Sequence, residues 1–502
     1  MGSFKSMTRR LTETLIQPFA QPAPYTLPDR IPPPSVPSAE QKAPGQNIPA
    51  AADYDKIRSK YVRWEKLPNG EWSADWNHVN APRADNVRSM LGWYTLTGAY
   101  RFPEVVHVDL MGRGRTNYFF LVNFEPHHRP GRVPQQVVLR LCLPVCPYVK
   151  LESEVATTVW AARVSAAVPR IVVFDPSGRN PLGLEWLMME PAPGFPLQEL
   201  FLEGSTLTTG LEGFMWPRAA PKFTHQAMLD VGRQLCDFVE RTKTTAPGVP
   251  ANEVLIGSLR IDWATGKIYT GPVVSPHFYS ADRLFHEHAN NGPFESIEAY
   301  LLEYIAIWYR ENLDDEAMLR RLEDLTTVIK DMMKQVEALP EDYWPLPDNG
   351  GEGRMHGWPV TVSHADLHAG NVLVDEHGKL ASIMGWENAV LMPVPLRDVV
   401  TTLDEAFQRF GLGDIIDPYQ VGVGETLSVK VPLAGKPQSS EFPCKEVSSV
   451  MERTMRCRTA KEAVVRALKE VCENVALRRD EETRWIRQAG QELCDLGYRE
   501  KE

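Results

Sequence analysis

One short stretch of this 502-residue sequence carries polar residues whose types and spacing could do chemistry. It reads His364-Ala-Asp366-Leu-His368-Ala-Gly-Asn371, with an Asp two residues after the first His and an Asn five residues after that Asp. In a loop, Asp can accept a proton from an attacking hydroxyl, and Asn can offer its amide oxygen to magnesium. The stretch therefore predicts a phosphoryl-transfer loop. Asp366 and His364 are the catalytic candidates, with His364 holding the loop, and Asn371 is the candidate metal ligand.

Two other interpretations of this loop are open. A polar turn between two apolar strands would need no chemistry, but the spacing makes a catalytic origin the better explanation. Non-haem iron sites also use His-x-Asp, with a second His supplied from well downstream. The last histidine of the chain is His377, nine residues past His368, so all protein ligands would come from one short segment. We rank an iron site below phosphoryl transfer.

A candidate nucleotide-binding side lies earlier in the chain. Gly112 and Gly114 stand between two strand-like runs, where glycines would let backbone amides approach phosphates. A glycine pair between strands is, however, more often a hairpin turn. Arg140, on the third strand-like run, is placed to pair with phosphate, and Glu154 on the next helix is placed to pair with Arg140. The alternative for this pair is two unrelated surface charges.

The end of a later strand could form a hinge between two lobes. The segment Met188-Met189-Glu190-Pro191 ends a strand-like run and leads to Gly194. Backbone groups of Met189 and Glu190 would then contact an adenine base. An ordinary linker between lobes is compatible with the same residues.

Apolar periodicity predicts the elements that must position these residues. Strands are expected at 104–110, 117–122, 136–141, 169–174 and 184–189, with one helix at 151–163 among them. Later helices are expected at 225–243, 294–311, 315–338 and 395–410, and a hairpin at 259–262 and 267–269. Residues 361–385 are expected to run strand, loop, strand, turn, strand. The pattern indicates an α+β fold, with a small β-rich lobe followed by a larger, mainly helical lobe.

The flanking segments differ from this central part. Residues 1–50 are dominated by proline and predict a disordered arm, on which a protein partner could dock. Residues 51–103 hold several tryptophans and predict a folded extension that packs on the next domain. Residues 413–445 lack periodicity and predict an inserted loop, whereas 446–502 predict a charged, helical C-terminal extension.

Composition narrows the function classes. The formal net charge of −11 disfavours binding to nucleic acid, and no run of 18 apolar residues indicates a transmembrane segment. The seven cysteines are scattered, so neither a disulfide scaffold nor a zinc site is expected, and a reducing compartment fits. We expect a cytoplasmic protein. The N-terminal Met1-Gly2-Ser3 also fits a loose N-myristoylation pattern, and Arg9 and Arg10 also permit mitochondrial targeting.

Taken in chain order, the motifs of this sequence resemble those of the aminoglycoside phosphotransferase-like family of the protein-kinase-like superfamily, above all its fungal "phosphotransferase enzyme family" members. The resemblance spans about residues 104–410 and is carried by Val138-Leu-Arg140, Glu154-Val155-Ala156, Val168-Pro169-Arg170-Ile171, Asn180-Pro181-Leu182-Gly183, Met188-Met189-Glu190 with Gly194, Ile256-Gly257-Ser258-Leu259, Gly292-Pro293-Phe294, the loop 364–371 and Ile383-Met384-Gly385-Trp386-Glu387. It implies a two-lobed kinase-like fold, with an N-lobe at 104–190, a C-lobe at 191–412, and ATP between them.

The resemblance also implies roles for single residues. Asp366 matches the catalytic Asp, Asn371 matches the first metal ligand, and Glu154 matches the helix glutamate. Arg140 falls where many kinases have Lys, and its planar fork replaces a compact ammonium group.

Gly385 departs from the family, which has a second metal-binding Asp at this position. Magnesium commonly takes one or two carboxylate ligands. Losing one should cost several kcal/mol of transition-state stabilisation, which is on the order of a hundredfold in rate. Glu387, two residues on, shares a strand face with position 385 and could reach back, although a structural role is favoured.

The family resemblance and the departure from it at Gly385 leave two possible functions. The first is a phosphotransferase that uses ATP and magnesium to act on a hydroxyl of a small molecule. The alternative is a degenerate kinase-like protein that no longer transfers phosphate. Such a protein could serve in binding or regulation, or it could catalyse a non-phosphoryl reaction, such as the cyclisation of a natural product, between its lobes.

Overall fold

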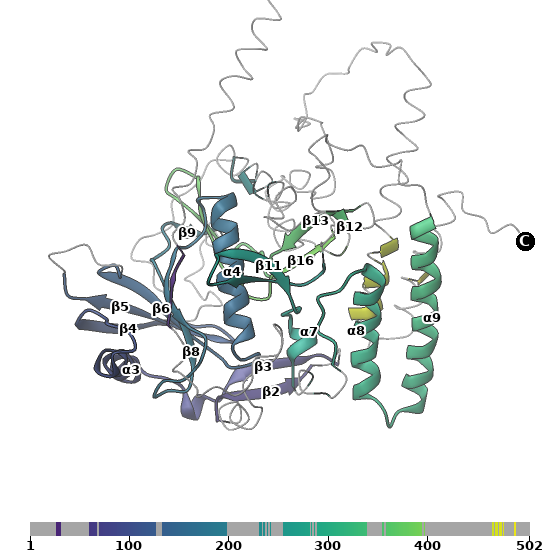
Figure 1. The fold of residues 1–502 in the computed structure, drawn as a ribbon, viewed down its shortest axis with the longest axis horizontal. Coiled ribbons are helices and arrows are strands. Elements are labelled where there is room, and N and C mark those ends of the chain that lie inside the picture. Colours follow the sequence, from purple (N-terminus) through teal and green to yellow (C-terminus); the bar gives the residue numbers. More distant parts are fainter. Residues whose placement is uncertain are drawn as a thin grey trace, which may run out of the picture.

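The computed structural model describes residues 27–31, 60–67, 70–126, 133–197, 255–281, 289–338 and 358–393, with isolated residues elsewhere. The inserted loop predicted at 413–445 and most of the predicted Pro-rich arm lie outside the described residues, as does nearly all of the helix predicted at 395–410. The helix predicted at 225–243 is described at seven positions, all of them helical. The described part forms a β-rich lobe and a larger lobe that holds most of the helices (Figure 1).

A six-stranded sheet forms the body of the small lobe. In spatial order, its strands are β1 (Asp29–Arg30), β7 (Ile171–Asp175), β8 (Glu185–Met189), β6 (Gln136–Cys142), β5 (Asn117–Phe124) and β4 (Val105–Arg113). Strand β1 runs parallel to β7, and the other neighbours are antiparallel. All of these strands except β1 were expected from the sequence, because β-branched and aromatic residues recur along them.

The sheet has two different faces because successive side chains of a strand point in opposite directions. Phe120 of β5 enters the core shared with helix α3 (Ala84–Thr97). Its neighbour Phe119 packs instead against the core that contains helix α4 (Val149–Val164). In the register of the sheet, Arg140 of β6 lies opposite Phe119. The side chain of Arg140 is thereby directed to the α4 side.

The segment predicted as a folded N-terminal extension contains a hairpin and a helix. Its elements are β2 (Val62–Lys66), β3 (Trp72–Trp76), the short 3-10 helix η1 (His78–Asn80) and α3. The Trp76 ring is buried and meets the Tyr118 ring of β5 edge-on, with 4.8 Å between ring centroids. The tryptophan-rich extension therefore packs on the sheet of the small lobe.

The predicted disordered arm contains an ordered stretch at residues 27–31. Strand β1 adds to the edge of β7, the Arg30 Nε group donates to Glu152 Oε1 at 2.7 Å, and Ile31 is buried. The prediction of disorder throughout 1–50 is therefore wrong at these residues. A Pro-rich chain is already extended, and the unpaired edge of a sheet readily accepts such a segment as a further strand.

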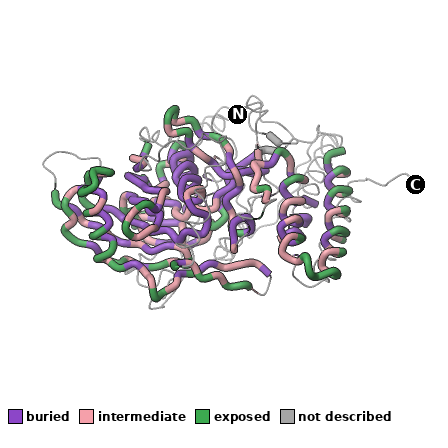
Figure 2. Tube along the Cα trace, turned by 60° about the horizontal axis from the view of Figure 1, so that its bottom comes forward, coloured by how far each residue is buried: buried purple, intermediate pink, exposed green. Residues whose placement is uncertain are grey.

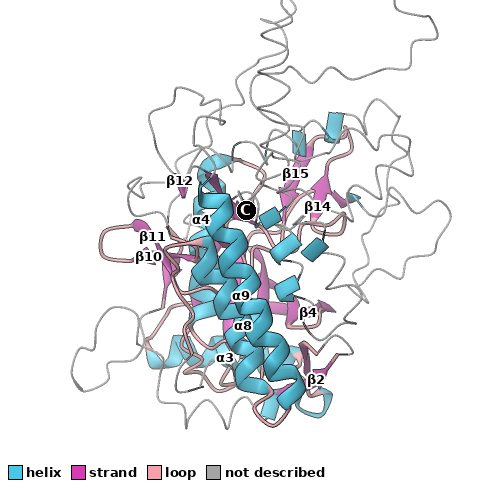
Figure 3. Ribbon diagram, turned by 90° about the vertical axis from the view of Figure 1, so that its right-hand side faces the viewer, coloured by secondary structure: helices cyan, strands magenta, loops and turns pink. Residues whose placement is uncertain are grey.

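The large lobe combines helices with short strands. Helices α8 (Ile297–Glu311) and α9 (Glu316–Ala338) pack side by side (Figure 3). The one-turn helix α7 (Pro276–Tyr279) precedes them in the sequence. The strands group as β10 (Ser258–Asp262) with β11 (Lys267–Gly271), β13 (Trp358–Ser363) with β12 (Arg354–Met355) and β16 (Val390–Pro393), and β14 (Val372–Val374) with β15 (Leu380–Ile383) and β9 (Phe195–Pro196). The expected hairpin at β10 and β11 and both expected long helices are present.

A continuous apolar core joins α4 to the large lobe. Buried residues run through the interior of both lobes (Figure 2). Trp160 of α4, Trp308 of α8, and Val362 and Ile383 from the strands around the 364–371 loop all belong to it. Residues near the C-terminus also contribute, and the Trp308 indole donates to the Cys472 carbonyl at 3.1 Å. The loop is thus carried by strands embedded in packed apolar residues.

Of the helices that the structure describes, none is long and apolar enough to cross a bilayer.

Candidate active site

The loop between β13 and β14 brings Asp366 and Asn371 together. The Asn371 amide nitrogen, Nδ2, donates to the Asp366 carbonyl at 2.8 Å and to the Asp366 carboxylate at 2.9 Å. The Asn371 backbone N–H donates to the His368 carbonyl at 2.9 Å and closes the turn. More than half of the Asp366 side chain, 57%, remains exposed. The loop therefore presents an oriented carboxylate to solvent and commits the nitrogen of Asn371, but not its amide oxygen, to that carboxylate.

The surroundings of Asp366 make it a better proton acceptor. Partial burial raises the pKa of the Asp366 carboxyl, and the negative charge of Glu387 acts in the same direction. The neighbouring His368 and the hydrogen bond from Asn371 oppose this change. A general base gains strength as its pKa rises toward the working pH. The direction of the shift suits the role predicted for this residue.

His364 supports the loop from inside the protein. Its ring is buried and meets the Trp386 ring edge-on, with 4.5 Å between centroids. Burial, with a smaller contribution from His368, lowers the pKa of His364 to about 4. The ring is therefore neutral at pH 7 and packs under the loop. Neither ring nitrogen has a hydrogen-bond partner among the described residues, so the expected hold on the loop by His364 hydrogen bonds is not seen, and the contact is one of packing.

Gly385 faces Asn371 across the strands β14 and β15. The Met384 N–H donates to the Asn371 carbonyl at 2.8 Å, which fixes the next residue beside the loop. A Cβ atom built on Gly385 would lie 2.8 Å from Asn371 Nδ2 and 3.5 Å from its Oδ1. A side chain at this position would therefore lie against the Asn371 amide, and Asn371 would have to shift to admit it. A metal-binding role for an acidic residue at 385 stays a prediction.

Glu387 is engaged elsewhere and does not replace that carboxylate. It accepts a hydrogen bond from Asn117 Nδ2 at 2.7 Å and forms an ion pair with Lys150. Burial opposes its ionisation, but the charges of Lys150 and Arg140 outweigh burial and hold the pKa of Glu387 at about 2. Its carboxylate is fully committed to two small-lobe residues. The structural role favoured from the sequence agrees with these contacts.

The donor set suits one magnesium ion better than two. Asn371 offers an amide oxygen, and a nucleotide would add phosphate oxygens, which together with water can complete an octahedral shell. A second ion would need the carboxylate that Gly385 lacks. Among the residues that the structure describes, no three His, Cys, Asp or Glu side chains gather in an arrangement that could hold a metal. Of the site residues named here, Asn371 would hold a magnesium ion through its amide oxygen, and binding of that ion stays a prediction.

Arg140 and Glu154 form a buried ion pair across the sheet and α4. Their side chains are 4% and 5% exposed. The register of β6 and the turn of α4 together bring the two charged groups into contact. Charged side chains are rarely this buried unless they are paired. The predicted pairing is present, and the alternative of two unrelated surface charges is excluded.

The glycines at 112 and 114 form a hairpin in the structure. The Gly114 N–H donates to the Asn117 carbonyl at 2.8 Å and so closes the turn between β4 and β5. Gly112 is buried within β4, opposite Phe119 and next to a bulge. The Gly114 amide is thus used within the hairpin, as the alternative interpretation allowed. A phosphate contact by this amide would need the turn to open.

Met189 and Glu190 lie at the end of the central strand β8. Met189 is buried and paired on both sides, with Val138 of β6 and Ile171 of β7. The Glu190 N–H donates to the Arg170 carbonyl at 2.9 Å, and the two side chains form an exposed ion pair. The segment leaves the small lobe at the place expected for a hinge. Contact with an adenine base stays a prediction.

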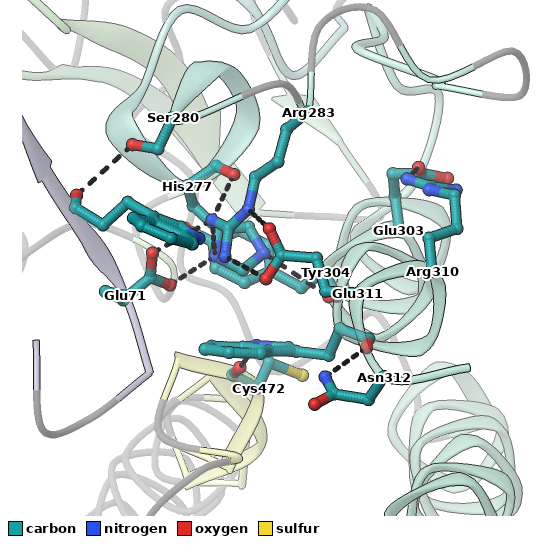
Figure 4. Close-up of polar contacts among 12 residues, drawn as sticks. Glu71, His277, Ser280, Arg283, Glu303, Tyr304, Arg310, Glu311, Asn312 and Cys472 are labelled. Carbon is teal, nitrogen blue, oxygen red and sulfur yellow. Dashed lines mark hydrogen bonds and ion pairs between the residues drawn. The ribbon is translucent and has the colours of Figure 1, made fainter. Parts of the chain in front are cut away.

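A second buried ionic cluster ties the N-terminal extension to the large lobe (Figure 4). Arg283 forms two hydrogen bonds with the Glu311 carboxylate at 2.7 and 3.0 Å, and a third with Glu71 at 3.0 Å. His277 contacts the same Glu71 carboxylate at 2.6 Å and stacks on Tyr304 with 3.7 Å between ring centroids. Burial opposes ionisation of Glu71, but His277 and Arg283 lower its pKa to about 2. The cluster joins three segments that are distant in the sequence, around Glu71, at 277–283 and in α8.

Sequence reasoning missed Lys150, Asn117 and this ionic cluster. Lys150 had a usable signal, because it lies one helical turn before Glu154 and shares its face of α4. Glu71 and Arg283 had none, because their contact joins residues more than 200 positions apart.

The two lobes, the loop with its Asp and Asn, and the ion pair behind it define a kinase-like phosphotransferase fold of the α+β class. A family model described as "Phosphotransferase enzyme family" matches residues 108–427. This match covers more than half of the chain, and the chain belongs to that family.

Three solved structures that are similar to this chain are each only 10–11% identical to it. An ethanolamine kinase from Plasmodium vivax is 10% identical, with a TM-score of 0.38, over 82% of this chain and 89% of that chain. A protein from Ralstonia eutropha described as an aminoglycoside phosphotransferase is 11% identical, with a TM-score of 0.35, over 83% and 99%. A macrolide 2'-phosphotransferase type I is 11% identical, with a TM-score of 0.31, over 81% and 98%. No curated protein sequence matches this chain significantly.

Proposed function

We propose that this protein is an ATP-dependent phosphotransferase that acts on a hydroxyl group of a small molecule. The observation that carries the proposal is the double hydrogen bond from Asn371 to Asp366. It orients a solvent-accessible carboxylate as a base and leaves the Asn371 amide oxygen for a metal ion. Membership of a phosphotransferase family supports the same reaction class.

In this proposal each residue has a defined task. Asp366 accepts the proton of the attacking hydroxyl. Arg140 binds phosphate oxygens of the nucleotide, and Glu154 holds the guanidinium group in place. Magnesium, held by Asn371 Oδ1 and phosphate oxygens, would neutralise charge on the phosphates. His364 stays neutral and supports the loop.

A second function is favoured by one observation, the glycine at position 385. The family resemblance implies an Asp at this position. Phosphoryl transfer without its carboxylate loses one polar group, whereas a site that only binds a ligand does not need that group. A degenerate kinase-like protein that binds or regulates, or that catalyses a non-phosphoryl reaction, would retain the fold and the ion pair. The two functions make different predictions about nucleotide binding.

Thermal unfolding of the full chain with ATP, with and without magnesium, separates them. Because a ligand stabilises the folded state that binds it, a concentration one hundred times Kd should add about 2.7 kcal/mol to the unfolding free energy. The phosphotransferase should be stabilised by ATP, and more strongly when magnesium is present. An unchanged Tm at millimolar ATP and magnesium would contradict the phosphotransferase and favour the second function.

A further inference from the structure

The carboxylate of Glu387 joins the large lobe to two separate elements of the small lobe. It accepts a hydrogen bond from Asn117, the first residue of β5, at 2.7 Å. It also pairs with Lys150, the second residue of α4. The side chains of Lys150 and Glu387 are 4% and 15% exposed, so water screens this pair only weakly. The contact is therefore a firm link between β5, α4 and the segment that follows β15.

The same helix carries the glutamate that holds Arg140. Lys150 and Glu154 are four residues apart and lie on one face of α4. Lys150 faces Glu387 on one side, and Glu154 faces Arg140 on the other. Arg140 also lowers the pKa of Glu387, so the four groups share one electrostatic environment. Two cations and two anions thus balance one another in the interior.

Two further contacts hold the first turn of α4 against the large lobe. The Arg260 guanidinium of β10 donates to the Val149 carbonyl at 3.2 Å. The Trp263 indole, in the turn after β10, donates to Glu152 at 2.8 Å. Together with the Glu387 link, they fix where the helix begins. The position of Glu154, one turn further along, follows from where this first turn is held.

We propose that Glu387 is a positioning residue for the nucleotide site: through Lys150 it fixes α4, and thereby it holds Glu154 against Arg140. This inference rests on the proposed function, because it assumes that Arg140 binds the nucleotide phosphates. Glu387 therefore acts through Lys150, although it lies only two residues from Gly385, where a metal ligand is missing.

A double-mutant cycle on the full chain tests this role. The variants are Glu387→Gln, Lys150→Met and their combination, with Lys150→Arg as the conservative replacement and Glu316→Gln, in an exposed pair on α9, as the matched control. Each variant is assayed for its ATP dissociation constant over a range of magnesium concentrations, and for its unfolding in urea.

The two single variants should each weaken ATP binding by about tenfold, and the double variant should be no weaker than either, because both remove the same link. Lys150→Arg should retain most of the affinity, and Glu316→Gln should match the wild type. The magnesium concentration needed for half-maximal stabilisation should stay unchanged in all of them.

Three results would overturn the inference. The first is a loss of ATP affinity in the double variant that equals the product of the losses in the two single variants. The second is a changed magnesium requirement in Glu387→Gln alone. The third is lower stability of the single variants with normal ATP affinity. If Glu387→Gln does not fold, Lys150→Met and Lys150→Arg carry the test: Lys150→Met should weaken ATP binding, and Lys150→Arg should retain it, because only the arginine can still pair with Glu387. If the wild type binds no ATP, the proposed function fails. In that case the free energies of unfolding in urea still test the link between Lys150 and Glu387, because losses that add in the double variant would refute it.

Discussion

Gly385 affects both the chemistry and the backbone of the candidate site. Its φ angle of +80° lies in the left-handed region, where residues other than glycine are strained by roughly 1–2 kcal/mol and Asn or Asp are tolerated best. The Asn371 amide fills the space that a side chain at 385 would enter. The site thus presents one carboxylate and one amide oxygen, and position 385 adds no carboxylate to them.

Replacing Gly385 with Asp should strengthen magnesium binding in the presence of ATP by about tenfold, or 1.4 kcal/mol, because it adds a carboxylate next to the Asn371 amide once that amide shifts to admit it. The same change should lower stability by about 1–2 kcal/mol because of the backbone angle. The measurement is the magnesium concentration at half-maximal ATP-dependent stabilisation. Gly385→Ala adds the same Cβ beside Asn371, at a backbone angle that suits Ala less well than Asp, and it brings no ligand. Equal magnesium requirements in the Asp and Ala variants would contradict this placement of residue 385.

At the scale of elements, the β2–β3 hairpin connects both lobes. At its end, Trp76 packs on Tyr118 of the small lobe. At its turn, Glu71 enters the ionic cluster of the large lobe with Arg283, whose side chain is only 1% exposed. Arg283 also lies over the Trp308 ring, 5.3 Å from its centroid. The hairpin therefore braces the two lobes against each other.

Removing the central cation of this brace should be strongly destabilising. In Arg283→Met, the carboxylates of Glu71 and Glu311 lose their shared partner while partly buried, and breaking such a pair costs about 3–5 kcal/mol. The matched control is Arg320→Met, which removes an exposed pair on α9 and should cost about 0.5 kcal/mol or less. If the slope of unfolding free energy against urea concentration is the same in all variants, the midpoints of urea unfolding give the loss of stability in each. A loss at position 283 no larger than that at 320 would show that the cluster does not hold the hairpin.

At the scale of the whole molecule, much of the architecture could be predicted from local sequence patterns. The alternation in β5 and β6 and the loop at 364–371 carry their own signals, since strand period and motif spacing are local properties. The Arg140–Glu154 pair could be placed because Arg140 falls on the third expected strand and Glu154 on the helix that follows it. The family membership is confirmed by the match over residues 108–427.

The rest depends on contacts between distant segments, which leave no local signal. Strand β1 has two residues and exists because β7 offers an edge to it. The bond between Asn117 and Glu387 spans 270 positions, and that between Glu71 and Arg283 spans 212. Gly112 and Gly114 showed the converse difficulty, since one glycine pattern fits both a phosphate loop and a hairpin. Only the hydrogen bond of Gly114 distinguishes them.

The most direct test of the account is the release of inorganic phosphate from ATP by the full chain, with water as acceptor, in wild type and Asp366→Asn. Removing a general base typically lowers a rate by about 10²–10⁴-fold. The account predicts slow, magnesium-stimulated release by the wild type. It predicts a loss of at least about a hundredfold in Asp366→Asn, with ATP-dependent stabilisation retained. Equal rates in the two proteins, or no release by a wild type that binds ATP, would contradict it.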